Sequence, residues 1–136
     1  MGTSEVVVPE PVLRELEAHG PDDPTVRAIR DMDWISLVTG PKIAPGIAAW
    51  DLGAGESAVL SLAKSEPGAW AVIDDGEARR CARSLSIPDI GTLGLVLLAK
   101  RVGRTPLARP VVERLRASGM YLSDVVINQA LERMGE

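Results

Sequence analysis

The sequence is poor in the side chains that many enzymes rely on, with one histidine, one cysteine and no phenylalanine among 136 residues. Because His19 and Cys81 stand alone, a zinc site of Cys and His ligands and a disulfide within the chain are both excluded. A Ser/His/Asp triad would have to rest entirely on His19. Any metal is therefore expected to bind mainly oxygen ligands, and Cys81 is expected to pack in the core.

Aromatic residues and long apolar runs are also scarce. The four aromatics, Trp34, Trp50, Trp70 and Tyr121, are too few to build the stacking surface by which RRM domains and OB-folds hold single-stranded bases. The longest apolar run, residues 93–99, is too short to span a bilayer. Residues 1–5 lack the basic and apolar pattern of a targeting segment. We therefore expect a cytoplasmic protein without a membrane partner.

The size and composition of the chain favour one globular domain over residues 1–136. A mass of 14.5 kDa with 46% hydrophobic and 25% charged residues is typical of a compact domain. The charge is uneven, because residues 1–68 carry five Lys/Arg against eleven Asp/Glu, whereas residues 69–136 carry ten against eight. A basic stretch contains Lys100, Arg101, Arg104, Arg109, Arg114 and Arg116. This stretch is either a binding surface for a polyanion or a solvated helix face.

The apolar periodicity alternates between strand and helix. Strands are expected at residues 6–8, 34–38, 69–73 and 87–90, helices at 10–18, 24–31, 56–66, 77–85, 92–102, 110–117 and 123–134, and a loop at 40–51. In the helix at 77–85, for example, Ala78, Cys81, Ala82 and Leu85 follow the spacing of one buried face. The alternation predicts a layered α/β fold with a mainly parallel sheet.

Acidic residues fall where the expected strands lead into helices. Glu15 lies in the helix after the first strand, Glu56 opens a middle helix, and Asp74 and Asp75 directly follow a strand. Ligands bind at this edge of a parallel sheet, and crowded carboxylates require a cation, with hard oxygen ligands selecting Mg²⁺ or Mn²⁺. Such a cleft would hydrolyse a phosphodiester without histidine. The alternatives are a solvated Glu15, a helix-dipole partner at Glu56, and helix caps at Asp74 or Asp75.

A second motif overlaps one of these acids. Residues 53–58, Gly-Ala-Gly-Glu-Ser-Ala, match the loose dinucleotide-binding pattern G-x-G-x-x-A. Residues 44–52 contain a Pro-Gly break and do not read as the strand that this motif requires. Glu56 would also place a negative side chain where a pyrophosphate must approach. Nucleotide binding is therefore the weaker reading.

Four segments of the sequence occur in a distinctive order. They are Val6-Val7-Val8-Pro9 with Glu15, Leu52-Gly53-Ala54-Gly55-Glu56, Ile73-Asp74-Asp75-Gly76-Glu77-Ala78-Arg79, and Gly91-Thr92-Leu93-Gly94 with Ala99-Lys100. In this order the chain resembles the PIN-domain nucleases from residue 5 to residue 136. It looks most similar to a PIN-like branch of prokaryotic proteins that is grouped with toxin–antitoxin ribonucleases.

The resemblance implies a PIN-like three-layer fold, with a short, mainly parallel sheet flanked by helices. It further implies a divalent-metal-dependent endoribonuclease, the toxin component of a toxin–antitoxin pair, with RNA as substrate and an antitoxin-like protein as partner. Glu15, Glu56, Asp74 and Asp75 would be the catalytic acids, and Glu15, Glu56 and Asp75 would hold Mg²⁺ or Mn²⁺. The candidate contacts to nucleic acid are Arg79, Thr92, Lys100, Arg101 and Arg104.

The start of the sequence departs from the family pattern. PIN domains begin with a strand that ends in a metal-binding aspartate, whereas this sequence starts at the position of the family's second strand. We therefore expect an N-terminally shortened domain in which the remaining strands pair directly, a second copy supplies cover, or the gene product is longer. A homodimer is expected on this ground. The alternative function is a catalytically degenerate PIN-like protein that binds nucleic acid or a partner protein without cleaving.

Overall fold

The computed structural model describes residues 6–20, 22–33, 35–101, 103–117 and 123–136. These residues form two compact units, a first unit over Met1–Asp89 and a second unit over Ile90–Glu136. The elements of the first unit are β1 (Val6–Pro9), α1 (Glu10–Glu17), α2 (Pro24–Asp31), β2 (Ile35–Val38), α3 (Pro45–Ala48), α4 (Ala54–Ser65), β3 (Ala71–Val72) and α5 (Gly76–Ser84). β4 (Asp89–Ile90) spans the boundary, and α6 (Thr92–Arg101), α7 (Arg109–Ala117) and α8 (Asp124–Arg133) follow it.

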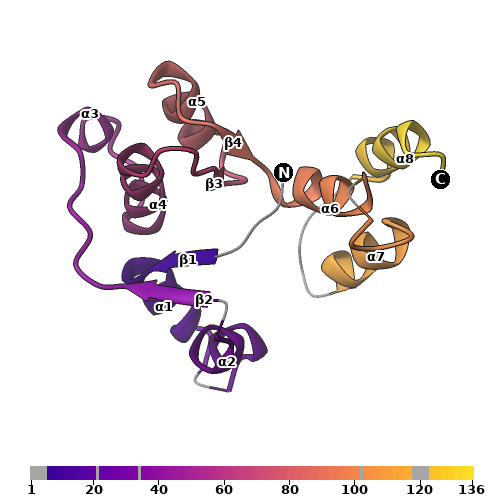
Figure 1. Cartoon of the computed structure of the whole chain (residues 1–136), viewed down its shortest axis with the longest axis horizontal. Helices are drawn as coiled ribbons and strands as arrows, with labels where there is room; N and C mark the ends of the chain where they lie inside the picture. Colours follow the sequence, from indigo (N-terminus) through magenta and orange to yellow (C-terminus); the bar gives the residue numbers. More distant parts are fainter. Residues whose placement is uncertain (1–5, 21, 34, 102, 118–122) are drawn as a thin grey trace. The chain divides into compact units, whose positions relative to one another are not determined.

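The four strands of the described part pair two by two. β1 and β2 are parallel, with Val6 opposite Ile35 and Val8 opposite Leu37, and they lie side by side in Figure 1. β3 pairs with β4 in a second sheet. The α/β class predicted from the sequence is confirmed. The single predicted sheet is replaced by two pairs, because β3 and β4 keep only two residues each of the longer runs expected.

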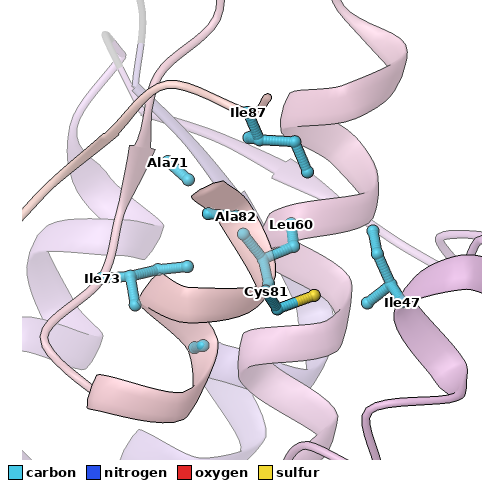
Figure 2. Close-up of a cluster of buried hydrophobic side chains, with 8 residues drawn as sticks. Ile47, Leu60, Ala71, Ile73, Cys81, Ala82 and Ile87 are labelled. Atoms are coloured by element: carbon cyan, nitrogen blue, oxygen red, sulfur yellow. The ribbon is translucent and has the colours of Figure 1, made fainter. Parts of the chain in front are cut away.

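The larger core of the first unit lies between α3, α4, α5 and β3 (Figure 2). Ile47, Leu60 and Cys81 are fully buried there. Burial raises the pKa of the Cys81 thiol, an effect that the nearby Lys64 partly offsets. The expectation that Cys81 is a packing residue is confirmed, since its thiol is shielded and protonated at neutral pH.

The segment predicted as a loop at residues 40–51 contains one helical turn, α3. Pro45 occupies one of the first two helical positions, where its fixed φ suits a helix and its missing N–H removes no hydrogen bond. Ile47, inside this turn, is fully buried. The loop prediction was wrong at α3, because two prolines and two glycines mask a turn that is held by one buried side chain.

A smaller core of the first unit holds α1 and α2 against β1 and β2. Leu13, Val26 and Ile29 are its buried members, and Val8, Leu16 and Ile35 pack against them. α2 begins at Pro24, as predicted, and Asp23 caps it, with the Thr25 N–H donating to Asp23 Oδ1 at 2.8 Å. α1 also packs against α4, and this packing brings Glu15 of α1 to the start of α4.

The second unit is helical around its own core. Ala108, Val112, Ile127 and Leu131 are buried within it, with Val96 at the edge. Ser123 caps α8 by accepting the Val126 N–H at 3.3 Å. Among the described helices, none combines the length and the apolar character that crossing a bilayer requires.

Candidate acidic site

The first turn of α4 carries a carboxylate that comes from α1. The Gly55 N–H donates to Glu15 Oε1 at 3.1 Å, across a separation of 40 residues. Gly55 is buried, and a Cβ at this position would lie 2.9 Å from both carboxylate oxygens of Glu15. The glycine therefore allows the Glu15 carboxylate to approach the backbone of the helix end.

A second carboxylate lies at the same helix end. Glu56 belongs to the first turn of α4, and its Oε2 would lie 2.5 Å from a Cβ at Gly53, the residue that precedes the helix. Glu15 and Glu56, hereafter the acid pair, thus lie over neighbouring glycines. The positive end of the helix dipole stabilises both charges.

A hollow of about 590 Å³ opens beside this helix end. α1 contributes Glu10, Pro11 and Arg14, the segment between β2 and α4 contributes Asp51 among others, and α4 contributes Ala54 and Ser57. Arg14 forms an ion pair with Glu10. Asp51 has a φ of 53°, in the left-handed region that Asp tolerates better than most residues. The sequence patterns did not identify these polar residues as site residues, although Asp51 lies close before the Gly-rich turn at residues 53–58.

The two aspartates that follow β3, Asp74 and Asp75, lie at the start of α5. Asp75 is the N-cap of α5, and its Oδ2 accepts the Ala78 N–H at 3.0 Å. Asp74 precedes it, and both residues are exposed. α5 and β3 each pack against α4, so the acid pair and the two aspartates belong to elements of one packed unit.

The metal site expected from the sequence requires three carboxylates in contact with one ion. Among the described residues, no group of three or more His, Cys, Asp or Glu side chains is close enough to hold a metal. Two of the expected ligands, the acid pair, lie at the same helix end. Mg²⁺ commonly keeps several waters and binds through one or two protein carboxylates together with substrate phosphates, so two carboxylates fit this ion.

Arg79, an expected nucleic-acid contact, already has a partner within the first unit. Its Nε donates to Asp89 Oδ2 at 3.0 Å, and Arg83 Nε lies 3.8 Å from Asp89 Oδ1. The Asp89 side chain is only 9% exposed. Two arginines of α5 therefore hold the start of β4 against their own helix. No local pattern predicts this contact, because Asp89 falls within the predicted strand at 87–90.

The other expected nucleic-acid contacts belong to the second unit. Thr92 is the first residue of α6, and Arg101 and Arg104 are exposed at and just beyond the end of that helix. Lys100 is 17% exposed and donates to Glu136 Oε2 at 2.6 Å. Sequence reasoning missed Glu136 because nothing in the local pattern links it to a residue 36 positions away.

The Gly-rich turn at residues 53–58 is arranged unlike a dinucleotide site. The Gly55 N–H, a donor that a pyrophosphate would need, already donates to Glu15. Two carboxylates at this end would repel a phosphate that arrives without a cation. α3 and coil precede α4, in place of the strand that the dinucleotide motif requires.

The structure is that of an α/β protein with two carboxylates at the start of one helix. The chain matches the family model of the PIN domain over residues 2–136 and belongs to the PIN domain family. No curated protein matches the chain. No solved structure matches it either. PIN domains are nuclease-type domains that generally use divalent metals, so the chain has the fold of a nuclease.

Proposed function

We propose that this protein is a divalent-metal-dependent endoribonuclease that hydrolyses RNA phosphodiester bonds through an acidic site at the start of α4. The observation that carries the proposal is that Glu15 and Glu56, from two elements distant in the sequence, both place their carboxylates at the start of α4. Membership of the PIN domain family supports the same chemistry. The hollow beside the start of α4 falls in the usual size range of ligand sites, and its described lining includes Arg14, Ala54 and Ser57 rather than the acid pair.

The residues of the proposed site would have distinct tasks. Glu15 and Glu56 would hold Mg²⁺ or Mn²⁺, which when bound activates water and neutralises charge on the phosphate. Glu15 is oriented by the Gly55 N–H, which occupies one lone pair of Oε1 and leaves Oε2 available. Arg14 lines the hollow and would contact the RNA backbone next to the acids. Asp74 and Asp75 remain proposed members of the site, and Arg79, Thr92, Lys100, Arg101 and Arg104 remain proposed RNA contacts.

One observation favours a second candidate, a PIN-like protein that binds RNA or a partner protein without cleaving it. Asp75 uses its carboxylate to cap α5, and the described residues contain no group of three metal-binding side chains. In this candidate the acids would serve mainly to stabilise helix ends. The two candidates differ in one measurable property, the hydrolysis of RNA.

The test is cleavage of a labelled single-stranded RNA with and without Mn²⁺. We expect cleavage that requires the metal and falls by at least about a hundredfold in Glu56→Gln, as for loss of a major electrostatic contact to the transition state. Glu66→Gln is the matched control, because Glu66 ends the same helix at its far end and is exposed. RNA binding without cleavage would replace the first candidate with the second.

The biological setting is also a proposal. We place the protein in the cytoplasm, as the toxin-type member of a pair with an antitoxin-like protein. A free, buried cysteine is compatible with a reducing compartment. We further propose a homodimer, supported by the exposed apolar side chains of Val6, Val7 and Leu37 on β1 and β2.

A further inference from the structure

The side-chain carboxylate of Glu136 is held within the second unit by groups that no local sequence pattern connects. Glu136 Oε2 accepts from Lys100 Nζ at 2.6 Å and from the Ala108 N–H at 2.8 Å. Glu136 Oε1 accepts the Arg109 N–H at 3.1 Å, and the Arg109 guanidinium donates to the Glu136 main-chain oxygen at 3.2 Å. Lys100, Ala108 and Arg109, hereafter the cradle, thus surround one carboxylate.

The cradle has the construction of a phosphate site. Ala108 and Arg109 lie at the start of α7, where main-chain N–H groups have no partner inside the helix and point outward. Ala108 is fully buried, and Lys100 is further fixed by donating to the Met134 carbonyl at 2.7 Å. An ammonium and two aligned N–H groups form short, charge-assisted hydrogen bonds with any oxyanion.

The charge around the cradle exceeds what one carboxylate balances. Residues 100–109 contain four basic residues, Lys100, Arg101, Arg104 and Arg109, and no acid. In the described part of the chain, Arg101 and Arg104 form no ion pair with a carboxylate. A polyanion would satisfy this segment more completely than Glu136 does alone.

We propose that the cradle is a phosphate-binding site, and that Glu136 occupies it as an intramolecular competitor. When the Glu136 carboxylate leaves, a phosphate oxygen takes its place on the same three donors. The shared chemistry is a phosphate group, which either free phosphate or an RNA phosphodiester supplies. The proposal needs no metal and no cleavage, so it stands or falls independently of the nuclease function.

The first experiment measures rescue by inorganic phosphate. Glu136→Ala removes the side-chain carboxylate from Lys100 Nζ and from the N–H groups of Ala108 and Arg109. Glu132→Ala removes the same charge from an exposed position on α8. In thermal unfolding, phosphate at fixed ionic strength should raise the Tm of Glu136→Ala at least about twofold more than that of wild type or Glu132→Ala. Adding Lys100→Gln should abolish this rescue. An equal response of Glu136→Ala and Glu132→Ala overturns the proposal.

The second experiment separates the two sources of phosphate. Binding of a short labelled single-stranded RNA is followed by fluorescence anisotropy in EDTA. If RNA is the natural source, Glu136→Ala binds roughly tenfold tighter than Glu132→Ala, and inorganic phosphate competes. If free phosphate is the source, only the Tm responds.

A second variant tests the proposal if Glu136→Ala does not fold. Should Glu136→Ala not fold, Glu136→Gln keeps an oxygen for the N–H donors and weakens only the charge-assisted bonds. Phosphate should then rescue Glu136→Gln in the same manner. A lack of response to phosphate and to RNA in both variants overturns the proposal.

Discussion

At the residue scale, Gly55 determines how closely the Glu15 carboxylate approaches α4. The space that a Cβ would need lies 2.9 Å from both carboxylate oxygens of Glu15. Those atoms are the far end of a flexible side chain, so an alanine would displace the carboxylate and leave the backbone in place. Gly55 is therefore part of the proposed site, although it carries no functional group.

Gly55→Ala should separate activity from stability. We expect its unfolding free energy to stay within about 1 kcal/mol of wild type, because alanine's better helix propensity offsets a lost hydrogen bond. Mn²⁺-dependent RNA cleavage should fall at least about tenfold. Urea unfolding and a cleavage assay check the two expectations. Gly76→Ala is the control, since nothing lies within 4 Å of its added Cβ, and equal activity of the two variants would contradict our assignment.

The residues of the site were only partly predictable from the sequence. The positions of Glu15 and Glu56 between strands and helices drew attention to them, and the structure brings them to one helix end. The reach of Glu15 to Gly55 depends on the packing of α1 on α4, which no local pattern encodes. The contact of Lys100 with Glu136 was not predicted for the same reason.

At the element scale, α5 depends on its cap. Asp75→Ala should lower the unfolding free energy by about 1 kcal/mol, whereas Asp75→Asn should change it by only a few tenths, because Asn caps a helix as well as Asp does. If Asp75 is also a metal ligand, Asp75→Asn should lose cleavage while keeping stability. Urea unfolding and RNA cleavage of both variants show whether Asp75 is a helix cap alone or also a metal ligand. Equal destabilisation by Ala and Asn would contradict the cap.

The start of α7 should respond to acid through Glu136. The hydrogen bond from Lys100, assisted by the Ala108 N–H, lowers the pKa of Glu136 from 4.5 to about 2. Because the unfolded chain takes up the proton more readily, this contact stabilises the fold fully above pH 4.5 and loses its effect as the pH falls toward 2.

Comparison with Glu136→Gln isolates this contribution. Above pH 4.5, wild type should have the higher Tm, and the difference should narrow steadily as the pH approaches 2. Thermal unfolding at a series of pH values measures it, and the other carboxyls titrate alike in both proteins. A difference in Tm that stays constant over this range would show that Glu136 is not held by the cradle.

Elements with a clear amphipathic period were predictable to within a residue or two. The predicted ranges 24–31 and 77–85 correspond to α2 and α5, whose buried residues follow helical spacing. α3 escaped because a single turn is too short to show a period. The strand runs at 69–73 and 87–90 were overextended, because β3 and β4 each keep only two paired residues.

At the scale of the whole molecule, the order of short motifs predicted the family correctly, whereas the pairing of strands could not be read from the sequence. A strand run shows how apolar a segment is but does not name its neighbour, since pairing depends on contacts distant in the chain. The charge asymmetry follows the division into units. The first unit carries eight Lys/Arg and fifteen Asp/Glu, and the second carries seven and four.

The proposed homodimer is tested by its mass in solution. Val7 is 45% exposed on β1, a strand whose only partner in the described part is β2. Light scattering after size exclusion should give twice the 14.5 kDa of the chain. Val7→Lys should shift the protein toward the single-chain mass, because a buried lysine opposes association. A single-chain mass for wild type at every concentration would contradict the dimer.

The central claim is that Glu15 and Glu56 act together on one divalent cation, and Mn²⁺ binding followed by electron paramagnetic resonance tests it most directly. We expect wild type and Glu66→Gln to bind Mn²⁺ alike, and Glu15→Gln and Glu56→Gln each to weaken binding at least about tenfold, as expected for loss of one of two charged ligands. Undiminished Mn²⁺ binding by both Glu15→Gln and Glu56→Gln would contradict the claim.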